Sequence, residues 1–421
     1  MTLDLTREDR NMLEGRYGPG VAMAMSIITR MAEVSGAAGL IDISAAHIDS
    51  ALFMGDATLE FAERLVELGA KVRVPTSLNV SGLDETGWRE WPVPEAYAEK
   101  ALRQMAAYQR MGCTPTWTCA PYQTEFRPQF GQQIAWGESN AIAFVNSVVG
   151  ARTERYPDLL DICAAITGRV PAIGLHLLEN RRGQILLRLE HVPRSMQDSS
   201  IFYPVLGTIM GRAAGERVPV VDGLDITPNE DQLKALGAAA ASAGGVALYH
   251  LVGLTPEAPS LQAVFQGLLP EEEVEINEDL LLTTYRGLSS ASGNRLDMVA
   301  VGCPHFSLAE FQQLVLIIKG KRRHPDVQFL VTTNRFMVGK AWEAGYLDAL
   351  HEFGARVSLD ACILTSPMLP PEIQVILTNS GKYTYYTPGL LNRQVFLGSL
   401  EECVDSAVEG RLVREDSVWN R

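Results

Sequence analysis

The sequence lacks the features that would place this chain in a membrane, on nucleic acid or outside the cell. No apolar run approaches the ~18 residues that a membrane helix needs. The first seven residues contain no basic region followed by an apolar run, so they do not form a secretory signal. Lysine and arginine total 36 against 50 acidic residues, and the net charge of -14 disfavours binding to nucleic acid or anionic membranes. We therefore expect a cytoplasmic protein.

Cysteine is also scarce, and the common local metal and nucleotide motifs are missing. Six cysteines in 421 residues are too few for a disulfide scaffold, so in a reducing compartment they serve as buried thiols or as metal ligands. No C-x-x-C pair or histidine cluster marks a local zinc site, and no glycine fingerprint or Walker loop marks a nucleotide site. Any metal site must therefore draw its ligands from distant parts of the chain.

What is present is a nearly regular alternation of helix-like and strand-like segments. Residues Ser307 to Glu310 have the capping-box pattern that opens a helix, here running through Ile318. Helices are also expected over 21–34, 58–68 and 94–109, and strands over 40–43, 246–252, 298–301, 327–331, 357–359 and 373–377. The alternation predicts an α/β fold of two or three lobes, with parallel sheets covered by helices. The segments 181–183 and 270–273 are weak linker candidates, and neither marks a firm domain boundary.

Four cysteines lie where a ligand site is expected. Cys303 follows one predicted strand and precedes the capped helix, Cys362 follows another strand, and Cys113 and Cys119 share a loop after a helix. In open α/β sheets, ligands gather at the carboxyl ends of strands, where distant loops converge. Three thiolates brought together there can hold iron and leave one coordination position for substrate.

The alternative to metal binding is that each cysteine is simply a small apolar side chain buried in the core. Cys163 and Cys403, each within an apolar helical segment, fit this interpretation well. Zinc is a second alternative, with Cys303 and His305 as a possible pair of ligands, although no local cluster completes such a site. Spacing alone leaves the metal undecided.

Two polar stretches also occur at expected loop or helix starts. Ser139 or Asn140, before the apolar helix expected over 141–149, suits an ordinary N-cap or a helix start that binds a carboxylate or phosphate. The stretch 378–382 suits an Asn/Gly turn or an anion clamp in which Lys382 supplies the charge.

Taken together, these motifs resemble the large subunit of the aconitase X family over nearly the whole chain, 1–421. The blocks that carry the resemblance are Ala46–Ser50, Pro75–Asn79, Thr118–Tyr122, Trp136–Ala141, Asn146–Thr153, Gly302–Pro304 and Ser380–Lys382. Each block is short, but their order and spread make coincidence improbable. The resemblance implies an aconitase-like fold of several α/β lobes, without the swivelling domain of that fold.

The resemblance also implies an iron–sulfur centre on three cysteines. Cys303 and Cys362 match two ligand positions, and the third falls on either Cys113 or Cys119, which the sequence does not separate. A 2Fe-2S cluster is favoured, with a 4Fe-4S cluster or a single iron as alternatives.

Members of this family dehydrate cis-3-hydroxy-L-proline or mevalonate 5-phosphate. Iron would bind the leaving hydroxyl while a base removes a proton from the adjacent carbon. We favour cis-3-hydroxy-L-proline, because no Arg/Lys cluster suited to a phosphate dianion stands out near the matched blocks. The expected substrate-binding residues are His47, Thr76, Ser77, Asn79, Glu138, Ser139, Asn140, Arg152, Gly381 and Lys382.

In the aconitase fold the catalytic base is a serine of the swivelling domain, which in this family carries a glycine–serine-rich stretch. This sequence contains no such stretch, so we expect a small partner subunit to complete the active site. Two other classes of function stay open at this point, a zinc-dependent hydrolase and a non-catalytic scaffold subunit.

Overall fold

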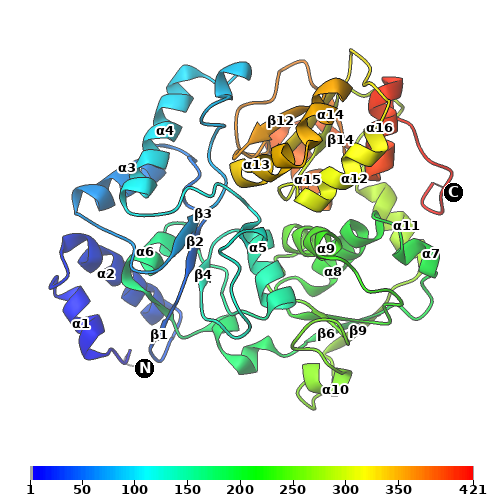
Figure 1. Ribbon diagram of the computed structural model, residues 1–421. Coiled ribbons are helices and arrows are strands. Elements are labelled where there is room, and N and C mark those ends of the chain that lie inside the picture. Colours follow the sequence, from blue (N-terminus) through cyan, green and yellow to red (C-terminus); the bar gives the residue numbers. More distant parts are fainter. Residues whose placement is uncertain (1–2, 421) are drawn as a thin grey trace.

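The computed structural model describes residues 3–420 of the chain. Three α/β lobes follow one another along the sequence, and each is built on its own parallel sheet (Figure 1). The first lobe runs from α1 to β5, the second from β6 to α11, and the third from β10 to α16. Among the described residues, no helix is both long and apolar enough to cross a membrane.

The first lobe holds a short parallel sheet in the order β3-β2-β4 and a separate antiparallel pair, β1 with β5. Its strands are β1 (Leu40–Asp42), β2 (Ala46–Ile48), β3 (Thr76–Leu78), β4 (Ala135–Trp136) and β5 (Arg169–Pro171). Its helices are α1 (Arg7–Leu13), α2 (Pro19–Val34), α3 (Asp56–Glu67), α4 (Glu95–Arg110), α5 (Ser139–Phe144) and α6 (Leu160–Thr167). Every residue of the parallel sheet is buried, as expected when helices and loops cover both faces.

The second lobe has a four-stranded parallel sheet in the order β8-β7-β6-β9. Its strands are β6 (Ile185–Arg188), β7 (Pro219–Asp222), β8 (His250–Leu251) and β9 (Glu272–Glu275), and its helices are α7 (Arg194–Gln197), α8 (Phe202–Ala214), α9 (Glu230–Ala243), α10 (Leu261–Val264) and α11 (Glu278–Gly287). Helices α8 and α9 cross closely, because a Cβ atom at Gly207 would lie only 2.3 Å from the Leu236 carbonyl oxygen.

The third lobe contains a five-stranded parallel sheet in the order β12-β11-β10-β13-β14. Its strands are β10 (Met298–Val301), β11 (Gln328–Thr333), β12 (Arg356–Leu359), β13 (Val375–Thr378) and β14 (Gln394–Leu397). Its helices are α12 (Leu308–Ile318), α13 (Arg335–Glu343), α14 (Tyr346–Phe353), α15 (Gly381–Tyr386) and α16 (Leu400–Glu409).

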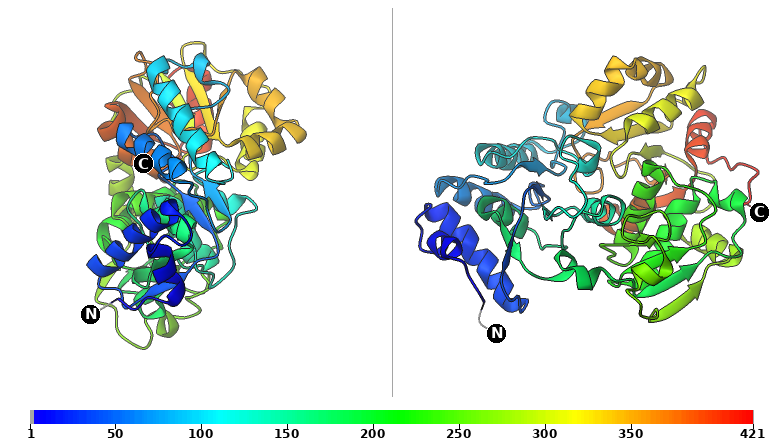
Figure 2. Two further views of the ribbon diagram at one scale, coloured as in Figure 1. Left: turned by 90° about the vertical axis from the view of Figure 1, so that its left-hand side faces the viewer. Right: turned by 60° about the horizontal axis from the view of Figure 1, so that its bottom comes forward.

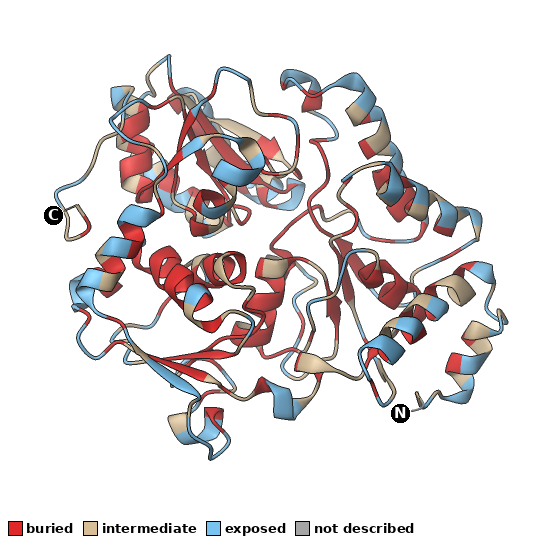
Figure 3. Cartoon of the chain, turned by 180° about the vertical axis from the view of Figure 1, so that it is seen from behind, coloured by how far each residue is buried: buried red, intermediate tan, exposed pale blue. Residues whose placement is uncertain are grey.

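Figure 2 shows the three lobes from two further sides. The lobes share buried apolar packing, with buried residues concentrated on the sheets and where the lobes meet (Figure 3). One apolar cluster includes Leu78 and Met105 of the first lobe together with Ala300 and Ile376 of the third. A second joins the second lobe to Leu397 on β14. Because the first and third lobes share a core, the loops between them are held at a defined separation.

Most of the expected elements are present, and the differences have local causes. The strand expected over 246–252 is reduced to β8, because this edge strand pairs with β7 at only two positions. Strand β3, which pairs with β2, is not among the strands that the sequence predicts. The helix over 141–149 has Glu138 as its N-cap, so neither Ser139 nor Asn140 caps it, and its last turn, Val145–Val149, is a π-helix.

Candidate active site

A cavity of about 190 Å³ lies between the first and third lobes. Its polar wall is built at the carboxyl ends of parallel strands from both lobes, the place where open α/β sheets bind ligands. From the first lobe, Asp49, Asn79 and Glu138 follow β2, β3 and β4. The remaining lining residues are Leu52, Val80, Cys119, Ser139, Gly302, Cys303, Pro304, His305, Thr332, Ala361, Cys362, Ile363, Leu364, Thr365, Lys382, Tyr386 and Leu390.

Three cysteines from distant parts of the chain line this cavity. Cys303 follows β10 and Cys362 follows β12, as the sequence predicts. Glycine is required between β10 and Cys303, because Gly302 has φ +96° and a Cβ atom there would lie 2.1 Å from the Thr332 carbonyl oxygen. The third cysteine in the wall is Cys119.

The direction of one loop explains why Cys119, and not its neighbour Cys113, lines the cavity. The amide of Thr114 donates to the Thr76 carbonyl at 2.8 Å, and the amide of Thr118 donates to the Leu78 carbonyl at 3.1 Å. The loop therefore runs parallel to β3, so Cys113 lies beside the start of this strand and Cys119 beyond its end. Cys113 is buried in the apolar core that also contains Cys163.

The cavity thiols lie among polar groups. The backbone amide of His305 donates a hydrogen bond to Sγ of Cys119 at 3.2 Å. Burial raises the pKa of Cys303 to about 12, with a further increase from Cys362, while the charge of Lys382 acts in the opposite direction. Burial also raises the pKa of Cys119 and of Cys362. A bound cation would therefore be needed to keep these groups as thiolates.

A buried ion pair joins the two lobes across the cavity. Lys382, in the first turn of α15, pairs with the carboxylate of Glu138. The same carboxylate accepts hydrogen bonds from the Asn140 side chain at 2.8 Å and from Asn79 at 3.2 Å. Burial opposes ionisation of Glu138, but the charge of Lys382 outweighs it and lowers the pKa of Glu138 to about 2. Both charges are therefore retained at neutral pH.

Asp49 is a second carboxylate in the wall and has a different environment. Its side chain accepts a hydrogen bond from Asn79, and no lysine, arginine or histidine among residues 3–420 pairs with it. Burial, followed by the charges of Glu138, Asp158 and Asp161, raises the pKa of Asp49 well above its usual value. Sequence reasoning missed Asp49, although it lies within a block of the family resemblance, because no strand was expected immediately before it.

Four of the expected substrate-binding residues lie behind the wall. His47 and Ser77 contact each other on neighbouring strands, with Nδ1 and Oγ 2.8 Å apart, and Thr76 bonds to the Val74 carbonyl. Burial lowers the pKa of His47 to about 3, so its ring is neutral. The Asn140 side chain donates to Glu138 and to the Cys119 carbonyl, which connects the carboxylate to the cysteine loop.

Gly381 positions Lys382 through close packing. A Cβ atom at Gly381 would lie 3.0 Å from both Ala239 and Pro204, so the start of α15 rests directly on α9 and α8. The helix begins with Ser380, whose side chain accepts from the amide of Tyr383. The stretch 378–382 is therefore a helix start and not only a turn.

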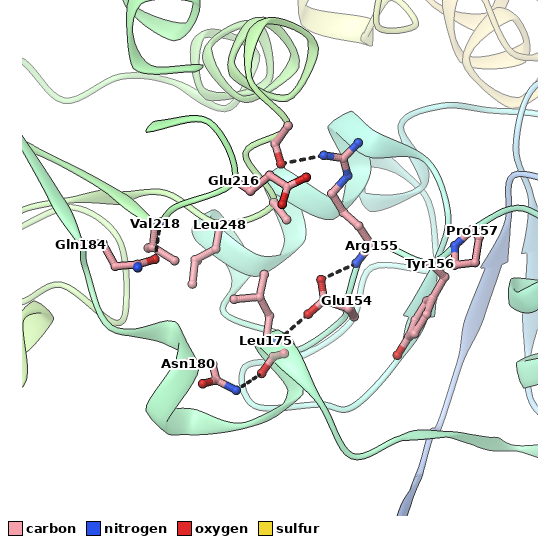
Figure 4. Close-up of a pocket in the computed structure, with 13 residues that line it drawn as sticks. Glu154, Arg155, Tyr156, Pro157, Leu175, Asn180, Gln184, Glu216, Val218 and Leu248 are labelled. Atoms are coloured by element: carbon pink, nitrogen blue, oxygen red, sulfur yellow. Dashed lines mark hydrogen bonds between the residues drawn. The ribbon is translucent and has the colours of Figure 1, made fainter. Parts of the chain in front are cut away.

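Arg152 is placed away from the cysteine cavity. It lines a separate cavity of about 670 Å³, beside Phe130 and Arg181. A third cavity, of about 510 Å³, lies between the first and second lobes (Figure 4). Its polar groups are bonded to one another, with Arg155 donating to the Gly245 carbonyl and Glu154 accepting from the Leu175 amide, and none of the expected site residues lines it.

Sequence profiles of one family match three successive parts of the chain. The aconitase X first domain matches residues 2–179, the second domain 183–286 and the third domain 296–409. The chain belongs to the aconitase X family. Its three lobes correspond to the three profiles.

Relatives within the aconitase X family are named dehydratases. The chain is 45% identical to cis-3-hydroxy-L-proline dehydratase of Pseudomonas aeruginosa, over 96% of this chain and 70% of that protein. It is 42% identical to the Hypocrea jecorina protein of the same name, over 97% of this chain and 69% of the relative. Its identity to the phosphomevalonate dehydratase large subunit of Methanocaldococcus jannaschii is 33%, over 94% of this chain and 98% of the relative.

The fold is that of a solved aconitase X. The crystal structure of the Thermococcus kodakaraensis protein in its holo-form matches with a TM-score of 0.86 and 32% sequence identity, covering 96% of this chain and 100% of that one. The expected aconitase-like α/β fold is thus confirmed. The aconitase X family implies an iron–sulfur centre in general terms, and the cysteine-lined cavity is the place in this chain with the thiols to hold one.

Proposed function

We propose that the chain carries the metal and most of the substrate site of a hydro-lyase that removes water from cis-3-hydroxy-L-proline. The observation that carries this proposal is the cavity itself, which is lined by Cys119, Cys303 and Cys362 together with the Glu138–Lys382 ion pair. The higher identity to two cis-3-hydroxy-L-proline dehydratases than to the phosphomevalonate enzymes supports the choice of substrate.

An iron–sulfur cluster suits the three cavity thiols, and we propose a 2Fe-2S cluster held by Cys119, Cys303 and Cys362. The three side chains that line the cavity are of the ligand type that iron–sulfur clusters use, cysteine thiolates, so their chemistry fits such a cluster. When bound, such a cluster supplies a Lewis acid for the hydroxyl that leaves. Thiolate ligands of this kind suit the reducing cytoplasm.

The residues of the chain bind and orient the substrate. The ammonium of Lys382, held at the cavity by Glu138, is the group that would bind the substrate carboxylate. Leu52, Leu364 and Leu390 form an apolar part of the wall that excludes water. Lys382 is the one cation at neutral pH among the described lining residues, because burial lowers the pKa of His305 to about 4. One paired lysine is a weak binding site for a phosphate dianion, which favours the hydroxy amino acid.

The base that removes the proton is proposed to come from a small swivel-domain unit. Within the cavity, Glu138 is already paired with Lys382, whose charge lowers the pKa of Glu138 to about 2 and makes it a weak base. The Methanocaldococcus jannaschii relative is named a large subunit, which supports the existence of a smaller counterpart. This chain spans 70% and 69% of the length of the two cis-3-hydroxy-L-proline dehydratases, which are therefore longer than the region that it matches.

The test is to purify the protein anaerobically, with and without co-purifying partners, and to record its absorbance, iron and sulfide. We expect a visible iron–sulfur spectrum from the chain alone, and dehydration of cis-3-hydroxy-L-proline only with a partner. Mevalonate 5-phosphate is the comparison substrate. Turnover of mevalonate 5-phosphate in preference to cis-3-hydroxy-L-proline would contradict the substrate, and full activity of the isolated chain would contradict the need for a partner.

A further inference from the structure

The two carboxylates of the cavity, Glu138 and Asp49, differ in how many hydrogen bonds and ion pairs they accept. Glu138 pairs with Lys382 and accepts hydrogen bonds from the amide and side chain of Asn140, from Ser139 and from Asn79. Asp49 shares the Asn79 side-chain amide with Glu138 and accepts from it through Oδ1, while its Oδ2 accepts no hydrogen bond from residues 3–420. Asp49 therefore retains the capacity to accept a hydrogen bond from a ligand.

The surroundings of Asp49 are unusually rich in negative charge. Glu138, Asp158 and Asp161 all act electrostatically on it, and Asp161 is occupied by the backbone amides of Asp49 and Ser50. An unpaired carboxylate in a buried site is costly unless an opposite charge reaches it. The described lining provides one cation, Lys382, and that lysine already serves Glu138. The missing positive charge is thus one that a ligand can bring.

The backbone holds Asp49 firmly at this position. A Cβ atom at Gly137 would lie 2.6 Å from the Asp49 Cβ, so the glycine lets the end of β4 approach the end of β2. The amide of Asp49 is fixed on Asp161 at 2.7 Å. A carboxylate fixed in this way is preorganised for one ligand geometry and loses little conformational freedom on binding.

We propose that Asp49 accepts the ring ammonium of the substrate and so selects a zwitterionic amino acid over a phosphorylated hydroxy acid. The inference rests on the proposed function, because it concerns the same cavity. In this arrangement Lys382 binds the substrate carboxylate and Asp49 binds the ammonium, two groups on adjacent atoms of the amino acid, and Asn79 links Asp49 to the Glu138–Lys382 pair. Mevalonate 5-phosphate has no cationic group and would bring only negative charge to Asp49. Asp49 is thus a specificity-determining residue.

The test compares two ligands that differ at one ring atom. L-Proline has the ring ammonium, and (S)-tetrahydrofuran-2-carboxylate has an ether oxygen in its place while keeping the carboxylate. Their affinities are measured by calorimetry on the anaerobically purified full chain, with its cluster and any partner that accompanies it. We expect L-proline to bind at least roughly tenfold more tightly, the size expected for a charged hydrogen bond.

Two isosteric substitutions identify the residue responsible. Asp49→Asn should remove most of the preference for L-proline while leaving the cluster spectrum unchanged. Asp158→Asn is the matched control, since it removes a charge that acts on Asp49 from an exposed position outside the cavity lining. It should preserve the preference.

Equal binding of the two ligands to the unsubstituted protein would overturn the inference, and this result needs no variant to fold. Retention of the full preference in Asp49→Asn would also overturn it. The outcome is separable from that of the proposed function. Preference for the ammonium without dehydration of cis-3-hydroxy-L-proline would contradict the function alone, whereas dehydration without such a preference would contradict the role of Asp49 alone.

Discussion

Two sets of three cysteines, alike in number and in being largely buried, occupy different kinds of environment. Cys119, Cys303 and Cys362 lie in loops at the carboxyl ends of strands and line one cavity. Cys113, Cys163 and Cys403 are buried in apolar clusters, the last two within α6 and α16. Burial alone therefore does not separate the cavity cysteines, which we propose as cluster ligands, from the core cysteines. Their position relative to strand ends separates the two sets.

The pair Cys113 and Cys119 makes this comparison within a single loop. An extended chain advances about 3.3 Å per residue, so six residues can separate the two thiols by up to about 20 Å. The loop runs beside β3, from the apolar core at its start to the cavity at its end. Cys119 has the amide of His305 and the charge of Lys382 nearby, whereas burial beside Asp161 raises the pKa of Cys113.

The largest expected effect separates these two residues directly. Cys119→Ala should abolish the cluster and the dehydratase activity, since a thiolate ligand is lost, while Cys113→Ala should keep both. Iron and sulfide per chain, with the anaerobic absorbance spectrum, measure the difference. Cys303→Ala and Cys362→Ala should behave like Cys119→Ala. A cluster that survives Cys119→Ala and disappears in Cys113→Ala would reverse the assignment.

Lys382→Met should have the next largest effect, on activity without loss of the cluster. The substitution removes the charge that we propose binds the substrate carboxylate, and it leaves Glu138 without its ion-pair partner. A decrease of about 100-fold in kcat/KM is expected, comparable to the loss of one charge-stabilising donor in other enzymes. Lys340→Met, on the exposed face of α13 over Phe336, is the control and should change nothing. Loss of the cluster in Lys382→Met would mean that the lysine acts on the metal site itself.

Lys234→Met tests how the second lobe supports the loop of the third lobe that contains Cys303 and His305. Lys234 is 2% exposed, pairs with Asp231 and Glu310, and donates to the His305 carbonyl at 3.3 Å. Removing one member of a buried charge network should lower the free energy of unfolding by about 3 kcal/mol and reduce cluster occupancy without abolishing it. Lys321→Met, which breaks the exposed pair with Asp405, should cost less than about 1 kcal/mol. Chemical denaturation and iron content measure both variants.

The sequence alone predicts the strands that precede Cys303 and Cys362, most clearly β10, whose four residues are all apolar and buried, whereas β12 is only partly buried. It does not separate Cys113 from Cys119, since the direction of their loop is set by hydrogen bonds to β3, about 40 residues away. Asp49 and Arg152 are a second case in which the sequence alone does not show which residues reach the cavity. Both belong to blocks of the resemblance, yet only Asp49 lines the cysteine cavity, because tertiary packing and not spacing decides which strand ends meet.

The smallest effects are expected for the cysteines buried in apolar clusters, the core set Cys113, Cys163 and Cys403, because each of these thiols contributes only packing. Cys163→Ala and Cys403→Ala each delete a fully buried sulfur atom and leave only the Cβ methyl group, which should lower the free energy of unfolding by about 1 kcal/mol. The absorbance spectrum and the ratio of iron to protein should remain unchanged, because neither residue lines the cavity. Thermal unfolding and iron analysis on the same samples separate the two quantities. A loss of iron that exceeds the loss of folded protein would show that the core set also supports the cluster, and would weaken the distinction between the two sets of cysteines.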